Sequence, residues 1–454
     1  MIALDTKPGQ AWALRSKHVY TPEGLRPAAV IVQGERIAAV VDHGDVPADI
    51  AVEDVGERWI LPGLVDTHVH MNEPGRTEWE GFETATRAAA AGGITTLIDM
   101  PLNSSPVTTT VAALTAKRDA AAGKLWVDVG FHGGVVPGNA GHIEPLIQDG
   151  ICAFKAFLCH SGIDEFPNAT EADLRDVMPI LARAGLPLFV HAELVGTLPA
   201  EVEARFAANP HSYRAYLATR PESWEVAAID MMVRLCRETR CPVHIVHLAA
   251  AEQARPFIAA AKAEGLPFTV ETCPHYLTFA AEEIPDGDTR FKCAPPLREE
   301  SQRQHLLAML RHGMLDTIGS DHSPAPPVIK HIADGNLREA WGGIASLQLL
   351  LSATWTVTAP ELRALDALTV RPAALVGLSH RKGSLRPGRD ADLVVFDAAA
   401  EFPVVAEKLE HRHPATPYDG RRLEGVVVTT YLRGRKVYDH GEFPGPPTGQ
   451  TLRR

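Results

Sequence analysis

Two patterns of apolar and polar residues divide the chain. Up to about Arg58, apolar and polar positions alternate across turn signals, as in residues 29–41, where Gly34 separates two short runs rich in valine, isoleucine and alanine. From Trp59 onward, apolar runs of strand length alternate with alanine-rich stretches of helical character. After about Leu378 the strand-like pattern returns. We therefore expect an α/β domain in the middle and a small β domain built from both chain ends.

The middle region contains eight predicted strands, which is the number that closes a (β/α)8 barrel. They cover residues 59–66, 95–100, 125–131, 150–158, 186–193, 241–248, 266–273 and 316–321. Predicted helices between them cover residues 80–91, 171–184, 224–238 and 251–265, and each begins near an acidic residue and ends near glycine or a basic residue. The prediction is an α/β fold with a TIM-like barrel over residues 59–378 and a small β-sandwich made of residues 1–58 and 379–454. The proline-rich tail is expected to lie extended.

Histidines recur at the carboxyl ends of the predicted strands, where barrel enzymes build their active sites. His68 and His70 are two residues apart on a strand, so their side chains point the same way. His191 and His247 end two further strands. A histidine pair on a strand is often a core or rim residue, and the metal-site hypothesis therefore rests on the whole set. His244 lies three residues before His247 and is expected to face the barrel exterior.

Two further residues complete this set. Lys155 lies in the apolar run 150–158, where an isolated buried ammonium would be costly. Either the lysine extends to solvent from the strand end, or burial lowers its pKa and the amine reacts with carbon dioxide to form a carbamate, which can bridge two cations. Asp321 ends the last strand and either caps a helix or binds metal and moves a proton. Imidazole and oxygen ligands without thiolate favour zinc, with cobalt, iron or manganese as alternatives.

Composition excludes several classes of function. The 454 residues carry a net charge of −12 with scattered basic residues, so nucleic acid is not an expected partner. Six cysteines without a C-x-x-C pair favour free thiols in a reducing cytoplasm. Residues 1–20 lack the pattern of a signal peptide, and no apolar run approaches the ~20 residues that cross a bilayer. We expect a cytoplasmic protein without a membrane partner.

The motifs resemble those of the cyclic amidohydrolases, the group that contains dihydroorotase, dihydropyrimidinase or hydantoinase, and allantoinase. In chain order they are PGLVDTHVH, FKAF, FVHAE, HIVHL, ETCPHYL, KCAPPLR and GSDHSP. The resemblance covers nearly the whole chain and implies a homotetramer with a binuclear metal centre in each subunit. The implied ligands are His68, His70, Lys155 as N6-carboxylysine, His191, His247 and Asp321.

Other positions distinguish the branches of this family. Asn72 stands where dihydroorotase-type sequences have an arginine, and His160 stands where hydantoinase-type sequences have a tyrosine. Residues 72–106, 159–167 and 336–348 instead resemble allantoinases. The expected substrate is therefore allantoin. The candidate substrate contacts are Asn103, His160 and backbone groups around Ala294 and Gly343.

The implied reaction is hydrolysis of the hydantoin ring of allantoin to allantoate, a step of purine or ureide degradation. A hydroxide bridging the metals would attack the ring carbonyl, and Asp321 would take the water's proton and return it to the departing nitrogen. A hydantoinase or dihydropyrimidinase acting on another cyclic amide is the alternative enzyme. A non-catalytic scaffold on the same fold is the alternative of another class, and the presence of all six ligand residues argues against it. His132 and His142 have no assigned role.

Overall fold

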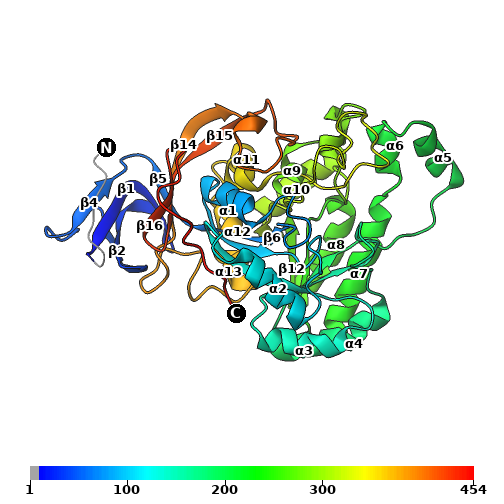
Figure 1. Cartoon of the computed structure of the whole chain (residues 1–454), viewed down its shortest axis with the longest axis horizontal. Helices are drawn as coiled ribbons and strands as arrows, with labels where there is room; N and C mark the ends of the chain where they lie inside the picture. The colour runs from blue at the N-terminus through cyan, green and yellow to red at the C-terminus, as the bar shows by residue number, and fades with distance from the viewer. Residues whose placement is uncertain (1–9) are drawn as a thin grey trace.

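A parallel barrel and a smaller β domain lie side by side in the computed structural model (Figure 1). The structure describes residues 10–454; residues 1–9, the first part of the segment in which no signal peptide was expected, lie outside the described residues. No helix of the described residues is long and apolar enough to cross a membrane. The predicted combination of a (β/α)8 barrel with a β domain from both chain ends is confirmed.

Eight parallel strands, paired in chain order, form the barrel. They are β6 (Leu64–Val69), β7 (Ile94–Asp99), β8 (Asp128–Gly134), β9 (Ala153–Phe157), β10 (Leu188–His191), β11 (Val243–Ile245), β12 (Phe268–Thr272) and β13 (Thr317–Ile318). A bridge between Val69 and His322 lies at the seam between the last strand and the first. The amide of His70 donates to the carbonyl of His322 across this seam, over 2.9 Å. The first strand and the segment after the last are therefore joined directly beside His70.

Helices surround the barrel (Figure 1). They are α1 (Phe82–Ala91), α2 (Val111–Ala121), α3 (Ala140–Gln148), α4 (Glu171–Ala184), α5 (Ala200–Ala208), α6 (Tyr213–Ala218), α7 (Glu222–Thr239), α8 (Ala251–Ala263), α9 (Pro274–Thr278), α10 (Glu300–Arg311), α11 (Leu350–Thr358), α12 (Leu362–Leu368) and α13 (Val370–Leu375). All four predicted helices are present, as α1, α4, α7 and α8. In α4 the side chains of Thr170 and Asp173 form a reciprocal capping box, and Gly185 ends the helix in the left-handed conformation.

The small domain joins the two chain ends in one curled sheet. Its strands are β1 (Trp12–Thr21), β2 (Gly24–Gln33), β3 (Arg36–Asp42), β4 (Ala51–Asp54), β5 (Trp59–Pro62), β14 (Leu393–Pro403), β15 (Arg422–Leu432) and β16 (Arg435–Asp439). β5 pairs with β1 from the N-terminal part and with β14 from the C-terminal part. The rings of Trp12 in β1 and Tyr431 in β15 are 5.2 Å apart although two strands separate β1 from β15, so the sheet closes around an apolar core.

One predicted strand is two elements of different domains. Within residues 59–66, β5 belongs to the small sheet, whereas β6 opens the barrel. Gly63 separates them, and a Cβ at this position would lie 2.2 Å from Oγ1 of Thr95. The close approach to β7 therefore requires glycine at the crossing point. Both halves are apolar because both are buried, and only their pairing partners distinguish them.

The proline-rich tail is extended and lies along the segment that leads into β8. The amide of Gly449 donates to the carbonyl of Leu125, and that of Leu452 donates to Val129, both over 2.7 Å. The side chain of Leu452 is buried in an apolar cluster that includes Ile98. The C-terminus is thus part of the barrel's packing.

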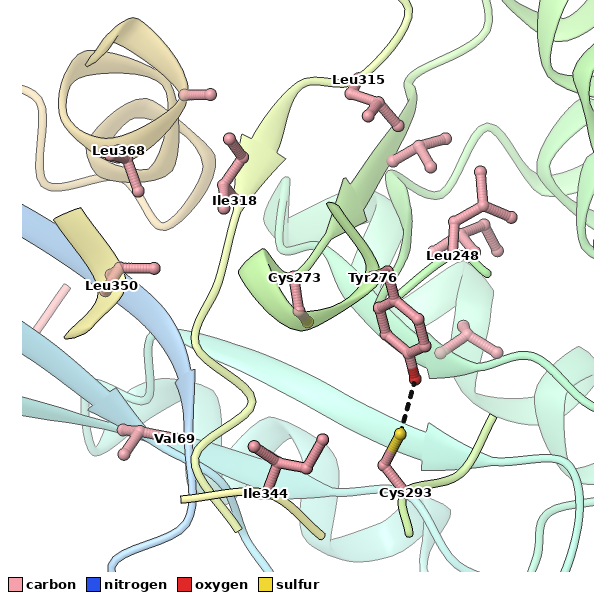
Figure 2. Close-up of a cluster of buried hydrophobic side chains, with 14 of the residues drawn as sticks. Val69, Leu248, Cys273, Tyr276, Cys293, Leu315, Ile318, Ile344, Leu350 and Leu368 are labelled. Carbon is pink, nitrogen blue, oxygen red and sulfur yellow. Dashed lines mark hydrogen bonds between the residues drawn. The ribbon is translucent and has the colours of Figure 1, made fainter. Parts of the chain in front are cut away.

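An apolar cluster supports the last barrel strand (Figure 2). Ile318 of β13 faces Leu368 of α12, and both side chains are buried. Leu350 and Val69 lie in the same cluster. Because Asp321 comes three residues after the end of β13, this packing helps to position the one carboxylate of the predicted metal site.

Candidate metal centre

A cavity of about 550 Å³ opens where the barrel strands end. It is lined by all six predicted metal-binding residues, namely His68, His70, Lys155, His191, His247 and Asp321. These residues come from five different barrel strands and their following loops. The fold thus brings together side chains that are up to 253 positions apart, as expected for the carboxyl ends of barrel strands.

His68, His70 and Asp321 form one part of the centre. Oδ1 of Asp321 lies 3.2 Å from Nε2 of His68 and 3.7 Å from Nε2 of His70. Their potential ligand atoms all lie within 4.8 Å of one another. Nδ1–H of His70 donates to the carbonyl of Leu102 over 3.4 Å, so Nε2 is the nitrogen that faces Asp321. This arrangement could hold one divalent cation.

His191, His247 and Lys155 form the other part. The two imidazole rings have centroids 4.6 Å apart, and the ring of Phe157 stacks on His191 at the same distance. Nζ of Lys155 is buried 5.0 Å from the centroid of Phe157, with no hydrogen-bond partner among residues 10–454. A buried nitrogen without a partner is unfavourable, so a further group is expected beside it.

Burial changes the protonation of these residues. It lowers the pKa of Lys155 to about 8 and that of His191 to about 4, and it lowers the pKa values of His70 and His247 well below the usual range. It also raises the pKa of Asp321. The imidazoles of His70, His191 and His247 are therefore neutral at pH 7, which is the form that binds metal.

The backbone turns sharply at two of these residues. His247 has φ of 41° and Asp321 has φ of 43°, both in the left-handed region. Non-glycine residues rarely adopt this conformation, and such strain concentrates at functional sites. β11 ends at Ile245 and β13 at Ile318, so both side chains are placed by turns beyond the strands.

The prediction for His244 was wrong, because this side chain faces the barrel interior. Its Nδ1 lies 2.8 Å from Oγ1 of Thr269, and its Nε2 lies 3.6 Å from Oε2 of Glu271. Its ring also contacts Phe189. The two-residue alternation of a strand stops at Ile245, and the turn at His247 brings both histidines to the inside.

The two unassigned histidines have different surroundings. His132 is buried in the barrel, where Nε2–H donates to the carbonyl of Thr67 over 2.9 Å and the ring contacts Phe189. His142 is exposed on α3. Neither residue lines the cavity.

Two carboxylates that the sequence analysis missed orient the histidines. Oε1 of Glu271 accepts from Nδ1 of His68 over 2.5 Å, and Oε2 of Glu193 accepts from Nε2 of His191 over 2.7 Å. Burial alone would raise the pKa of Glu193, but the Arg220 guanidinium and His191 lower it to about 2. Acidic residues within apolar strand segments were the signal for both, because a buried carboxylate needs a partner.

Replacing Glu271 by glutamine should weaken the centre without removing a ligand. The neutral amide would no longer hold the His68 tautomer as strongly, and we expect metal affinity or turnover to fall about 10- to 100-fold. Metal content after dialysis against a mild chelator, measured with turnover, tests this. Glu401→Gln, an exposed change in β14, is the control. Equal metal retention and turnover in both variants would contradict the orienting role.

Three of the four candidate substrate-contact residues line the cavity, and the fourth lies next to a lining residue. Asn103, His160 and Ala294 line the cavity. Asn103 is buried, whereas the side chain of His160 is 63% exposed and pairs with Asp164. Gly343 is not among the lining residues, whereas its neighbour Gly342 is. Other residues of the lining, which were not predicted from the sequence, include Tyr216, Arg220, Lys292 and Trp341.

The donor set fits a pair of divalent cations. Four imidazoles and a carboxylate face one cavity, and the orphaned amine of Lys155 lies between the two groups of histidines in the barrel strand order. A second set, Cys273, His275 and Asp321, also lies within 4.8 Å, but Cys273 and His275 are absent from the cavity lining. The open donors thus belong to the six predicted residues.

Comparisons with known proteins agree with this geometry. The chain is 47% identical to an allantoinase from Streptomyces avermitilis over 97% of its own length and 98% of that protein. It is 44% identical to an allantoinase from Arabidopsis thaliana, with 97% and 91% covered. The L-hydantoinase (dihydropyrimidinase) structure from Arthrobacter aurescens matches with a TM-score of 0.90 and 29% identity, over 97% of this chain and 99% of that chain.

The family assignment follows from the extent of these matches. The sequence pattern of the amidohydrolase family covers residues 59–437, which include the whole barrel and every residue of the candidate centre. The relatives match over nearly their full lengths, so the similarity is not confined to a shared domain. The chain belongs to the amidohydrolase family.

Proposed function

We propose that this protein hydrolyses the hydantoin ring of allantoin to give allantoate. The observation that carries the proposal is the 47% identity to an allantoinase over 97% of the chain. The solved hydantoinase structures have the same fold but lower identity, 29% for the one from Arthrobacter aurescens. An allantoinase and a hydantoinase both hydrolyse a cyclic amide, and the sequence similarity favours allantoin as the substrate.

The proposed centre contains two divalent cations held by His68, His70, His191, His247, Asp321 and carboxylated Lys155. In the modification, the neutral amine forms a bond to the carbon of carbon dioxide and loses a proton, which leaves a carbamate whose single negative charge is shared by two oxygens. A pKa of about 8 leaves about a tenth of the amine neutral at pH 7, far more than for an exposed lysine. Zinc is the proposed metal, with cobalt, iron and manganese as alternatives.

The chain's own residues would then carry out the proton transfers. Two bound cations would activate water at neutral pH and stabilise charge on the ring carbonyl oxygen. Asp321 would accept the proton of the attacking water and deliver it to the ring nitrogen as the carbon–nitrogen bond breaks. Its raised pKa makes it a better proton acceptor than an exposed aspartate. Glu271 and Glu193 would keep His68 and His191 in place.

The proposal extends to the substrate contacts and to the setting of the protein. Asn103, His160 and backbone groups near Ala294 and Gly343 would bind the ring and its ureido group, and the cavity lining supports the first three. All six cysteines are free and buried, which supports a reducing cytoplasm. The proposed homotetramer rests on the family resemblance.

Turnover of three rings by metal-analysed protein tests the proposed substrate. We expect allantoin to be hydrolysed at least about 100-fold more efficiently than dihydrouracil or dihydroorotate, because a site built to pair the ureido group leaves polar groups unpaired with either analogue. Protein stripped of metal is the control. Faster turnover of dihydrouracil would instead indicate a dihydropyrimidinase. No turnover of any of the three rings by protein that contains two metals per chain would favour a non-catalytic scaffold on the same fold.

A further inference from the structure

A buried lysine lies in the long segment between β13 and α11. Lys330 is 3% exposed, and no carboxylate within residues 10–454 forms an ion pair with it. Its ammonium instead donates to three backbone carbonyls, those of Lys292 over 2.8 Å, Trp341 over 3.0 Å and Gly343. An ammonium has three donors, so all of its hydrogen bonds are used.

The three carbonyls belong to two segments that line the cavity. Residues 292–294 contribute Lys292 and Ala294 to the lining, and residues 340–343 contribute all but Gly343. The segments also contact each other directly, since the amide of Gly343 donates to the carbonyl of Lys292 over 2.9 Å. Lys330 therefore joins the two segments at the point where they meet.

Other contacts hold the first segment from the opposite side. The hydroxyl of Tyr216 donates to the carbonyl of Cys293 over 2.7 Å, and that of Tyr276 donates to Pro295 over 2.6 Å. Figure 2 shows the Tyr276 hydroxyl pointing toward Cys293. The second segment is held by Lys330, by the side chain of Lys292, which donates to the carbonyl of Ala340 over 2.5 Å, and by the amide of Trp341, which donates to the carbonyl of Ile329 over 3.0 Å.

We propose that Lys330 is a positioning residue that sets the cavity-lining backbone of both segments for substrate binding. The amides of Ala294 and Gly342 donate to no other described residue, and a Cβ on Gly342 would lie 4.0 Å from the nitrogen of Ala294. The two residues are therefore neighbours in the cavity lining, where their unpaired N–H groups are available to a carbonyl oxygen of the ring. This inference rests on the proposed function, because it assigns the segments to the substrate of that site.

The chemistry of Lys330 differs from that of the chain's other fully buried structural lysines. Lys382 lies against Asp128 and Asp392, and Lys117 lies against Asp99. Lys330 has only carbonyl dipoles, and burial lowers its pKa to about 7, with Lys292 lowering it further and Cys293 and Asp288 opposing. A buried charge without a counter-ion is costly, so a purely packing role would be served as well by an apolar side chain.

Kinetics of Lys330→Met and Lys330→Gln test the proposal. Loss of the three hydrogen bonds should loosen the binding backbone in both ground and transition states, so we expect KM for allantoin to rise about 10-fold in the methionine variant with kcat changed far less. Glutamine keeps two N–H donors and should give a smaller rise. Metal content should remain that of the wild type. Lys382→Met is the buried-lysine control, which should lower the unfolding temperature and leave KM unchanged.

Hydrogen exchange gives a readout that does not depend on turnover. Amides of residues 340–343 should exchange faster in Lys330→Met than in the wild type or in Lys382→Met. Faster exchange with wild-type protein that does not hydrolyse allantoin would support the positioning role and reject the proposed function. Unchanged KM with unchanged exchange, or a fall in kcat that follows loss of metal, would overturn the proposal for Lys330.

Discussion

Replacing Asp321 by asparagine should abolish most of the hydrolysis, with kcat lowered by about 1,000-fold or more. The amide has the same shape but cannot accept the proton of the attacking water, and it removes one negative charge beside His68 and His70, whose Nε2 atoms lie 3.2 and 3.7 Å from Oδ1. Turnover of allantoin by the purified variant, with metal content determined on the same sample, is the measurement.

The metal content separates two roles of Asp321. Lost turnover with two metals retained would identify the carboxylate mainly as the proton carrier, whereas lost metal would identify it mainly as a ligand. Asp316→Asn is a matched control near the start of the same strand, where the carboxylate pairs with Lys262. That variant should keep kcat. A kcat of the Asp321→Asn variant within about tenfold of the wild-type value would contradict both roles.

Replacing Lys155 by alanine should remove both metals and the activity together. The side chain is the only one of the six that comes from β9, and its buried Nζ lacks a protein partner, so the carbamate it would carry links the two groups of histidines. We expect less than about a tenth of the wild-type metal to be retained after gel filtration. Mutation of a residue that only hydrogen-bonds to a metal ligand typically lowers metal affinity about 10- to 100-fold, and loss of a ligand shared by two metals should lower it further. Elemental analysis and turnover of the same preparation test this.

Small carboxylic acids should restore part of the Lys155→Ala activity. Acetate or propionate can place a carboxylate in the space that the side chain leaves, and metal should return with it. Wild-type protein reconstituted with metal should likewise recover faster with bicarbonate than in buffer free of carbon dioxide. Full metal content in the alanine variant without added acid would show that the lysine is not a ligand.

The sequence was sufficient for the barrel and for the composition of the site. Each strand is an apolar run, and the four histidines and Asp321 stand near or just after the end of such a run, where a barrel places its active site, whereas Lys155 lies inside its run. The apolar surroundings of Lys155 also predicted its burial. These properties depend on residues near one another in the chain, so local pattern contains them.

The structure alone decided which edges and faces meet. Residues 59–62 look like part of a barrel strand, but they pair with β1 and with β14, which is more than 300 positions away. His244 was placed outside because alternation was extended beyond Ile245, where the left-handed turn at His247 ends it.

The partners of the groups that support the site were equally hidden from the sequence. Glu271 lies 203 positions from His68, and Lys330 lies 38 from Lys292, yet each pair is in hydrogen-bond contact. Local sequence determines periodicity, burial and the type of each element, and it therefore determined the fold class and the candidate ligands of this protein. Which distant carboxylate or ammonium completes a buried hydrogen bond depends on the packing of the whole chain, so the orienting residues appeared only in the tertiary structure.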